Sequence, residues 1–313
     1  TIGNLSALVA AREAARHRRT RGSAPRAVCV TAETHSSVIH ALKVVMDVEV
    51  IEVPGDDRGR LVGTRLRETV QALPPAEREA IFAVVATAGT TNLGVVDDLD
   101  GVADVAADYG WWLHVDAAYG GAGLAAPSVR HLFAGVERAD SFIVDPHKWL
   151  FAPFDSCALL FRDPALARAA HTQRADYLDP VTVEGEWNPS DFAIQLTRRA
   201  RGLPFWFSLA VHGTDAYREA VEHTLEVARE GAALIAAAPH LRLVVEPDLT
   251  VLVFERIGWD ADDYARWGAR LLREQFAFVT PTRHRGRVCT RFAIVNPRTT
   301  AQDLAEIIDS MVA

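Results

Sequence analysis

Three short polar segments stand out because each follows an apolar run of strand length. They are TAGTT at residues 87–91, HVDAA at 114–118 and DPHK at 145–148. Continuous apolar runs suit strands that are buried on both faces of a parallel sheet. Ligands of such sheets bind beyond the carboxyl ends of the strands. We therefore expect Asp116 and Lys148 to face one small molecule.

Lysine is rare in this chain, which makes its position informative. Lys43 and Lys148 are the only lysines among 33 basic residues. An amine can lose its proton and attack a carbonyl, whereas a guanidinium cannot. A lysine that holds an aldehyde carbon and an acid that keeps a ring nitrogen protonated are the pair used by pyridoxal phosphate. Alone, Asp116 would more simply be a cap or salt-bridge acid, and Lys148 a surface amine.

The elements that must position this pair form an alternating pattern. Strands are predicted at 26–31, 48–53, 81–86, 111–115, 141–144 and 157–161, and helices from Leu5 and at 36–45, 64–73, 99–109 and 129–133. Alternating strands and helices indicate an α/β fold with a mostly parallel central sheet flanked by helices.

The second half of the chain has a different pattern. Residues 174–191 are polar and aperiodic, and a loop of this length is typically functional. A helix at 205–237, interrupted near Gly213, precedes strands at 241–245, 250–254, 277–280 and 288–294 and helices at 262–275 and 301–311. This pattern predicts a large domain at 1–203 and a small C-terminal α+β domain at 204–313.

Composition excludes several classes of function. The 33 Lys+Arg against 41 Asp+Glu give a net charge of −8, which argues against a nucleic-acid partner. The longest apolar runs fall far below the ~20 residues that cross a bilayer, so we expect no membrane helix. Three widely spaced cysteines fit no zinc motif and suggest free thiols in the cytoplasm. The chain begins at Thr1 inside a helical pattern, so we expect an N-terminally truncated fragment.

Six motifs, in order, resemble the group II pyridoxal-phosphate-dependent amino-acid decarboxylases, the family of aromatic-amino-acid, glutamate, histidine and diaminobutyrate decarboxylases. They are NLSALVAAR from Asn4, THSSV from Thr34, ATAGTT from Ala86, WLHVDAAYGG from Trp112, ADSFIVDPHKWL from Ala139 and RFAIVNPRTT from Arg291. The resemblance implies a fold-type I, transferase-like α/β domain, the cofactor pyridoxal 5′-phosphate, and a homodimer with shared active sites.

The resemblance also implies catalytic roles for Lys148, Asp116, His35 and Tyr177, and a cofactor contact for Ala118. Lys148 would form the internal aldimine, Asp116 would pair with the pyridine nitrogen, and Ala118 would lie under the ring. His35 would stack on the other face and steer the substrate carboxylate. Tyr177, in the long loop, matches a tyrosine that protonates Cα after carbon dioxide leaves.

Five further residues match positions near the cofactor in this family. Thr91 matches a threonine beside the cofactor, although a cap is the simpler role. Thr1 matches a hydroxyl of the phosphate loop, and His147 and Ser141 match positions near the lysine and the phosphate. For Ser141 a structural role is nearly as plausible. Asp145 would repel the phosphate dianion unless it turns away or pairs.

The resulting functional hypothesis is a carboxy-lyase that converts an L-amino acid to its amine and carbon dioxide. An aromatic or bulky substrate is favoured because Trp149, Phe151 and Phe154 follow the lysine. Glutamate or 2,4-diaminobutyrate decarboxylation and a decarboxylating aldehyde synthase remain alternatives. We interpret Arg198 and Arg201 as structural.

Two hypotheses from other classes stay open at this stage. Residues 121–126 fit G-x-G-x-x-A, the fingerprint of a nicotinamide-dependent oxidoreductase, but Pro127 interrupts the helix that this fingerprint must open. The second hypothesis is a non-catalytic relative that binds the cofactor without turnover. No G-x-S-x-G and no clustered His/Cys ligands occur, so neither a serine hydrolase nor a metal site is predicted.

Overall fold

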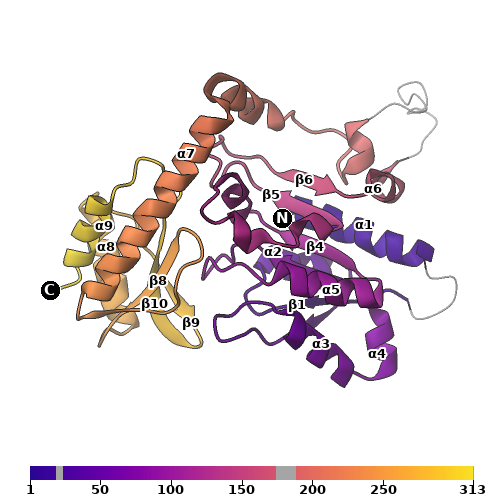
Figure 1. Cartoon of the computed structure of the whole chain (residues 1–313), viewed down its shortest axis with the longest axis horizontal. Coiled ribbons are helices and arrows are strands. Elements are labelled where there is room, and N and C mark those ends of the chain that lie inside the picture. The colour runs from indigo at the N-terminus through magenta and orange to yellow at the C-terminus, as the bar shows by residue number, and fades with distance from the viewer. Residues whose placement is uncertain (19–23, 174–187, 313) are drawn as a thin grey trace.

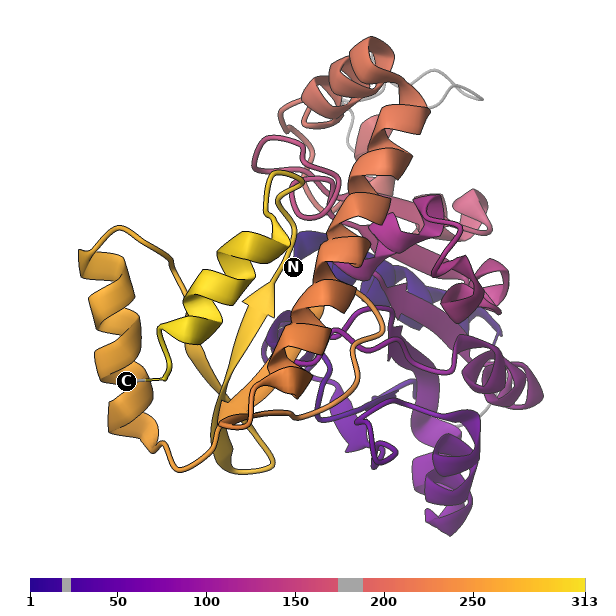
Figure 2. The same ribbon diagram turned by 60° about the vertical axis from the view of Figure 1, so that its left-hand side comes forward.

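A computed structural model describes residues 1–18, 24–173 and 188–312. Two β-sheets organise the described chain, one of six strands in the order β2-β1-β3-β4-β5-β6 and one of four in the order β7-β8-β10-β9 (Figure 1). The long helix α7 (Gly202–Ala237) runs between them, as Figures 1 and 2 both show. We propose the same division into residues 1–203 and 204–313, because α7 begins close to this boundary.

The larger sheet is mostly parallel, as predicted. Its strands are β1 (Ala27–Val30), β2 (Glu49–Glu52), β3 (Ile81–Thr87), β4 (Trp112–Asp116), β5 (Ser141–Val144) and β6 (Ala158–Phe161). Strands β1 to β5 run parallel, and β6 pairs antiparallel with β5 at the edge. All seven residues of β3 are buried, which explains its uninterrupted apolar sequence.

Helices cover both faces of this sheet. They are α1 (Ile2–Arg18), α2 (Ser36–His40), the π-helical turn η1 (Ala41–Val45), α3 (Gly63–Ala72), α4 (Pro75–Ala80), α5 (Leu99–Tyr109) and α6 (Pro164–His171). Leu8 and Leu42 share a core with Val85 on one face, whereas Leu66 shares a core with Val84 on the other. Successive residues of a strand point to opposite faces, so one strand supplies both cores.

The smaller sheet is antiparallel throughout and is covered by helices. Its elements are β7 (Leu241–Leu243), β8 (Val251–Arg256), α8 (Ala261–Arg273), β9 (Pro281–His284), β10 (Arg287–Ala293) and α9 (Ala301–Asp309). Side chains of α7, α8 and α9 share one core with β8 and β10. Helix α7 is interrupted at Gly213, whose φ of 77° and ψ of 163° are not helical. The interruption lies where the sequence predicted it.

The predicted strand at 277–280 is wrong. These residues are irregular, and the strand is Pro281–His284, joined to β10 by Arg285 and Gly286. Both turn residues have positive φ, 47° and 79°, as a two-residue type I′ hairpin requires. The apolar run misled the prediction, since Phe278 is exposed. Helices α4 and α6 were not predicted, and both begin with a proline.

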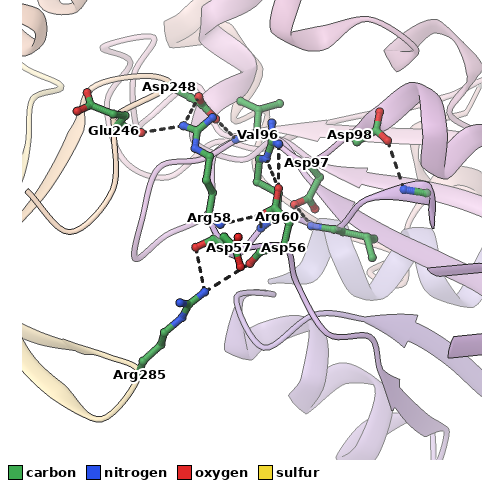
Figure 3. A network of polar contacts seen from close by, with 12 residues as sticks. Asp56, Asp57, Arg58, Arg60, Val96, Asp97, Asp98, Glu246, Asp248 and Arg285 are labelled. Atoms are coloured by element: carbon green, nitrogen blue, oxygen red, sulfur yellow. Dashed lines mark hydrogen bonds and ion pairs between the residues drawn. The ribbon is translucent and has the colours of Figure 1, made fainter. Parts of the chain in front are cut away.

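A polar network joins the loop before α3 to the smaller sheet (Figure 3). Arg58 donates to the Glu246 carbonyl at 2.8 Å and to Asp248 Oδ1 at 2.6 Å. The other oxygen of Asp248 accepts the Val96 N–H at 2.9 Å. Arg285 donates to the Asp57 carbonyl at 2.9 Å. These contacts fix the smaller sheet against the loops that follow β2 and β3.

Among the described residues, no helix has the length and apolar character needed to cross a membrane.

Candidate active site

The three polar segments that follow β3, β4 and β5 meet at one edge of the large sheet. Thr87 pairs with Asp116 in the β3–β4 register, and Asp116 pairs with Ile143 in the β4–β5 register. Beyond the strands, the Asp145 N–H donates to the Ala118 carbonyl at 2.9 Å. The expectation that these strand ends converge is therefore confirmed.

Lys148 is held by a tight turn that begins at Asp145. Its backbone N–H donates to the Asp145 carbonyl at 2.9 Å, and its Nζ lies 3.1 Å from Asp145 Oδ2. The Lys148 side chain is 37% exposed, whereas that of Asp145 is 10% exposed. The carboxylate that we expected to repel a phosphate dianion is thus paired with the amine.

Asp116 is a buried carboxylate whose described partners are neutral. Its Oδ2 accepts from Asn4 Nδ2 at 2.8 Å, and its Oδ1 accepts the Ala118 N–H at 3.1 Å. The residue is only 4% exposed, and no ion pair involves it in residues 1–18, 24–173 and 188–312. Because buried charges are generally paired, this carboxylate suits a ligand that brings a cationic N–H.

Asn4 and His114 belong to this site but were missed in the sequence. His114 Nε2 lies 3.0 Å from Asn4 Oδ1, and its Nδ1 lies 2.8 Å from Ser141 Oγ. Burial lowers the pKa of His114 to about 4, although the nearby Asp116 raises it. The sequence did offer a signal for both residues. Asn4 is a polar residue within the apolar pattern of a helix, and His114 is a polar residue within the apolar pattern of a strand. Such residues need buried partners.

Ser141 lies away from the other predicted site residues. It begins β5, so it is at the opposite end of the strand from Asp145. Its Oγ accepts from Trp112 Nε1 at 2.7 Å and contacts His114. This placement favours the structural alternative for Ser141 over a contact with the phosphate.

His35 caps helix α2 and remains half-buried. Its Nδ1 accepts the Ser37 N–H at 3.1 Å, so the neutral ring carries its proton on Nε2. Burial is the largest influence and lowers the pKa of His35, while Asp116 raises it and Lys148 lowers it. The charges of Asp116 and Lys148 therefore both reach the His35 ring.

The TAGTT loop is anchored by a buried acid. Asp97 accepts the N–H groups of Thr87 at 2.6 Å and Leu61 at 2.7 Å. Burial raises the pKa of Asp97 to about 7. The hydroxyls of Thr87 and Thr90 are buried and have no hydrogen-bond partner in the part of the chain that the structure describes. This loop thus encloses two hydroxyls that are shielded from solvent.

Close packing of glycines brings the TAGTT loop onto the turn after β4. A Cβ on Gly89 would lie 2.9 Å from Gly120 Cα, and a Cβ on Gly120 would lie 2.2 Å from the Ala88 carbonyl oxygen. Gly89 also has a φ of 97°. Residues 120–125 form a 3₁₀ segment and do not open an α-helix. The glycines therefore serve packing, and the nicotinamide fingerprint lacks the helix that it requires.

The remaining predicted residues differ in their surroundings. Thr91 is exposed, and its carbonyl accepts from Arg291. Ala118 is half-buried beside Asp116, and His147 Nδ1 accepts the Ser156 N–H at 3.0 Å. Thr1 is exposed at the start of α1. Tyr177 lies outside the described residues.

Trp149 belongs to the core. It is fully buried, stacks on Tyr119 with ring centroids 5.2 Å apart, and donates to Thr224 Oγ1 at 2.8 Å. It therefore does not support an aromatic substrate pocket. Phe151 is half-buried, and Phe154 is exposed. Arg201 forms an ion pair with Asp155 at 3.0 Å, which agrees with a structural role.

Comparison with known proteins identifies a family. The profile of the family described as "Pyridoxal-dependent decarboxylase conserved domain" matches residues 1–257. An aromatic-L-amino-acid decarboxylase of Bacillus atrophaeus is 30% identical over 98% of this chain and 66% of its own length. An L-2,4-diaminobutyrate decarboxylase of Rhizobium meliloti is 32% identical over 91% of this chain and 59% of its own. The chain thus spans less than two thirds of these relatives.

Solved structures agree with the fold expected from the sequence. The crystal structure of Oryza sativa TDC with PLP and tryptamine matches 99% of this chain and 68% of its own, with a TM-score of 0.87 and 27% identity. That of mouse CSAD matches 99% and 69%, with a TM-score of 0.86 and 27% identity.

Proposed function

We propose that this chain, which belongs to the pyridoxal-dependent decarboxylase family, contributes the catalytic centre of an enzyme that converts an aromatic L-amino acid to its amine and carbon dioxide. One observation supports this proposal above the others. The buried Asp116 carboxylate has only neutral donors among the described residues, and it lies at the same sheet edge as the Lys148 amine.

The residues present fit pyridoxal phosphate. Lys148 would hold the aldehyde carbon, Asp116 would hold the ring nitrogen as its N–H form, and Ala118 and His35 would flank the ring. The exposed residues Thr91 and Thr1 are candidates to hold its polar groups through their hydroxyls. When bound, the cofactor supplies a ring that accepts the electron pair released from Cα.

The protein's own groups would orient the substrate and handle its protons. His35 is neutral and offers an Nε2–H that can bind the substrate carboxylate. Asp145 fixes the position of the Lys148 amine through their 3.1 Å contact. Tyr177 would return a proton to Cα through its hydroxyl. Charge that develops only in the transition state is stabilised best by such preorganised groups.

An aromatic substrate is favoured by two relatives and by Phe154, the exposed aromatic residue after Lys148. The names of the relatives from Bacillus atrophaeus and Drosophila lebanonensis denote aromatic-L-amino-acid decarboxylases. Phe154 is exposed, whereas Phe151 packs against the core that holds Trp149.

A screen of carbon dioxide release tests this proposal. Full-length protein is supplied with pyridoxal phosphate and each of the twenty amino acids or 2,4-diaminobutyrate, with Lys148→Ala as the inactive control. We expect the highest kcat/KM for phenylalanine, tyrosine or tryptophan. A preference for glutamate or diaminobutyrate would overturn the substrate assignment, and no release from any substrate would overturn the activity.

We also propose a homodimer. Leu203, Trp206, Phe207 and Val211 of α7 are between 53% and 76% exposed, an apolar surface that a second copy could cover. Sedimentation equilibrium of the purified protein would give the dimer mass if this is correct. The cytoplasm is the proposed compartment, which the free cysteines Cys29, Cys157 and Cys289 support.

A further inference from the structure

A chain of four neutral side chains leads from the sheet interior to the Asp116 carboxylate. Its successive contacts are Trp112 Nε1 to Ser141 Oγ at 2.7 Å, Ser141 Oγ to His114 Nδ1 at 2.8 Å, His114 Nε2 to Asn4 Oδ1 at 3.0 Å, and Asn4 Nδ2 to Asp116 Oδ2 at 2.8 Å. Each of the four is at most 2% exposed. We call these four residues the Asp116 relay.

The two ends of the relay fix the direction of three of its four hydrogen bonds. A carboxylate can only accept, so Asn4 must donate through its amide nitrogen and present its oxygen to His114. His114 must then carry a proton on Nε2. At the other end, the Trp112 indole can only donate, so Ser141 accepts from it.

The histidine completes the chain in a single protonation state. With its proton on Nε2, a neutral His114 has an unprotonated Nδ1, which accepts the Ser141 hydroxyl proton. All four contacts are then satisfied with donors pointing toward Asp116. An imidazolium would instead carry a proton on Nδ1 and leave the Ser141 hydroxyl without this acceptor.

We propose that the relay orients the Asp116 carboxylate for the ring nitrogen of the cofactor, so that Asn4 and His114 are positioning residues. This inference rests on the proposed function, because it assigns Asp116 its pyridine partner. Asn4 reaches the carboxylate from α1, whereas His114 and Ser141 lie on β4 and β5. The relay therefore ties the orientation of one catalytic group to three elements of the fold.

The tautomer of His114 gives a test that needs no turnover. Purified protein labelled with ¹⁵N-histidine is examined by two-bond ¹H–¹⁵N correlation, and the His114 signals are assigned by their loss in His114→Gln. We expect the neutral Nε2–H form from pH 6 to pH 8. A proton on Nδ1, as the other tautomer or as imidazolium at pH 6, would overturn the relay.

A double-mutant cycle tests whether Asn4 acts through Asp116. Asn4→Ala removes both of its contacts, and a hydrogen bond to a charged group is commonly worth about tenfold or more in binding. We expect the dissociation constant of pyridoxal phosphate to rise about tenfold and the pH-dependent absorbance of the bound cofactor to change. In the Asp116→Asn background the same substitution should add little.

Controls separate positioning from general damage. Ser141→Ala interrupts the relay far from Asp116, whereas Ser141→Thr keeps a hydroxyl and should restore the cofactor absorbance. His223→Gln, on the exposed side of α7, should leave both readouts unchanged. An equal loss from Asn4→Ala with and without the Asp116 carboxylate would show a merely structural role and would overturn the proposal.

The two proposals can fail separately. If wild-type protein binds no pyridoxal phosphate, the proposed function fails, and the assignment of Asp116 to a ring nitrogen fails with it. The His114 tautomer would still decide whether the relay exists as a directed chain.

Discussion

The amine of Lys148 contacts Asp145 Oδ2 at 3.1 Å, so the proposed nucleophile has an anionic neighbour three residues away. The sequence raised the question of how a carboxylate could lie near a phosphate, and this pairing answers it. By contrast, Trp149 does not support a preference for aromatic substrates, because it is buried against Tyr119. Asp145 and Trp149 are both close to Lys148 in the sequence, yet one contacts its amine and the other packs in the core. The sequence spacing did not distinguish these two roles.

At the residue scale, Tyr177→Phe should change the product. Removing the hydroxyl takes away the proposed donor to Cα. With molecular oxygen as the oxidant, the amino acid would then give aldehyde, carbon dioxide, ammonia and hydrogen peroxide, and one O2 and one water would be consumed. Product chromatography with an oxygen electrode measures this. Unchanged amine formation would show that another group returns the proton.

His114 should make folding stability sensitive to acid. Burial depresses its pKa to about 4, below the ordinary value of 6.5. The unfolded chain therefore binds more protons between these values, so the stability associated with neutral His114 is present above pH 6.5 and is lost as the pH falls toward 4. Urea unfolding at pH 5 and pH 7 should show a smaller pH difference for His114→Gln than for wild type. An identical difference would contradict the assignment.

At the scale of elements, the active-site edge depends on glycines where two turns touch. Gly120 packs against the Ala88 carbonyl and Leu249, and Gly89 packs against Gly120. A hydrogen bond also holds the TAGTT loop next to Asp116, since the Ala88 N–H donates to the Asp116 carbonyl at 2.9 Å. Packing of these two turns therefore positions the ends of β3 and β4.

Gly120→Ala should disturb this contact. The added methyl group would lie 2.2 Å from the Ala88 oxygen, so the two turns must separate. Overpacking of this kind typically costs about 1–3 kcal/mol of unfolding free energy. Gly202→Ala is the matched control, because its Cβ would meet nothing within 4 Å. Equal unfolding free energies for the two variants would refute the packing argument.

The order and type of most elements were predictable because buried parallel strands and amphipathic helices leave strong patterns. The ends of β3, β4 and β5 were predictable for the same reason. The hairpin at Arg285 was not, because its positive φ values come with no Asn-Gly signal. Asn4 was missed as a site residue because its partners, Asp116 and His114, are more than one hundred residues away in the chain.

At the scale of the whole molecule, the smaller sheet contacts the same loops that carry the candidate site. Tyr119, three residues after Asp116, accepts the Thr250 N–H at 2.9 Å. Asn92, next to Thr91, donates to the Arg283 carbonyl at 2.9 Å. The loop after β2 adds the Arg58–Asp248 ion pair (Figure 3). The C-terminal part of the chain is therefore expected to stabilise the active-site loops.

Arg58→Ala should weaken this attachment. Asp248 is 8% exposed, so the substitution leaves a largely buried carboxylate whose remaining partner among the described residues is the Val96 N–H. We expect a loss of about 1–3 kcal/mol in unfolding free energy, measured by urea denaturation. Arg65→Ala removes an exposed pair with Glu68 and should cost less than about 1 kcal/mol. A larger loss from Arg65→Ala would contradict the importance of the network.

The most direct measurement is hydride trapping of the cofactor followed by peptide mass spectrometry. Protein incubated with pyridoxal phosphate is reduced with borohydride, digested and analysed at both lysines. We expect the reduced pyridoxyl phosphate on Lys148 and none on Lys43. Attachment to Lys43, or no attachment at all, would contradict this expectation.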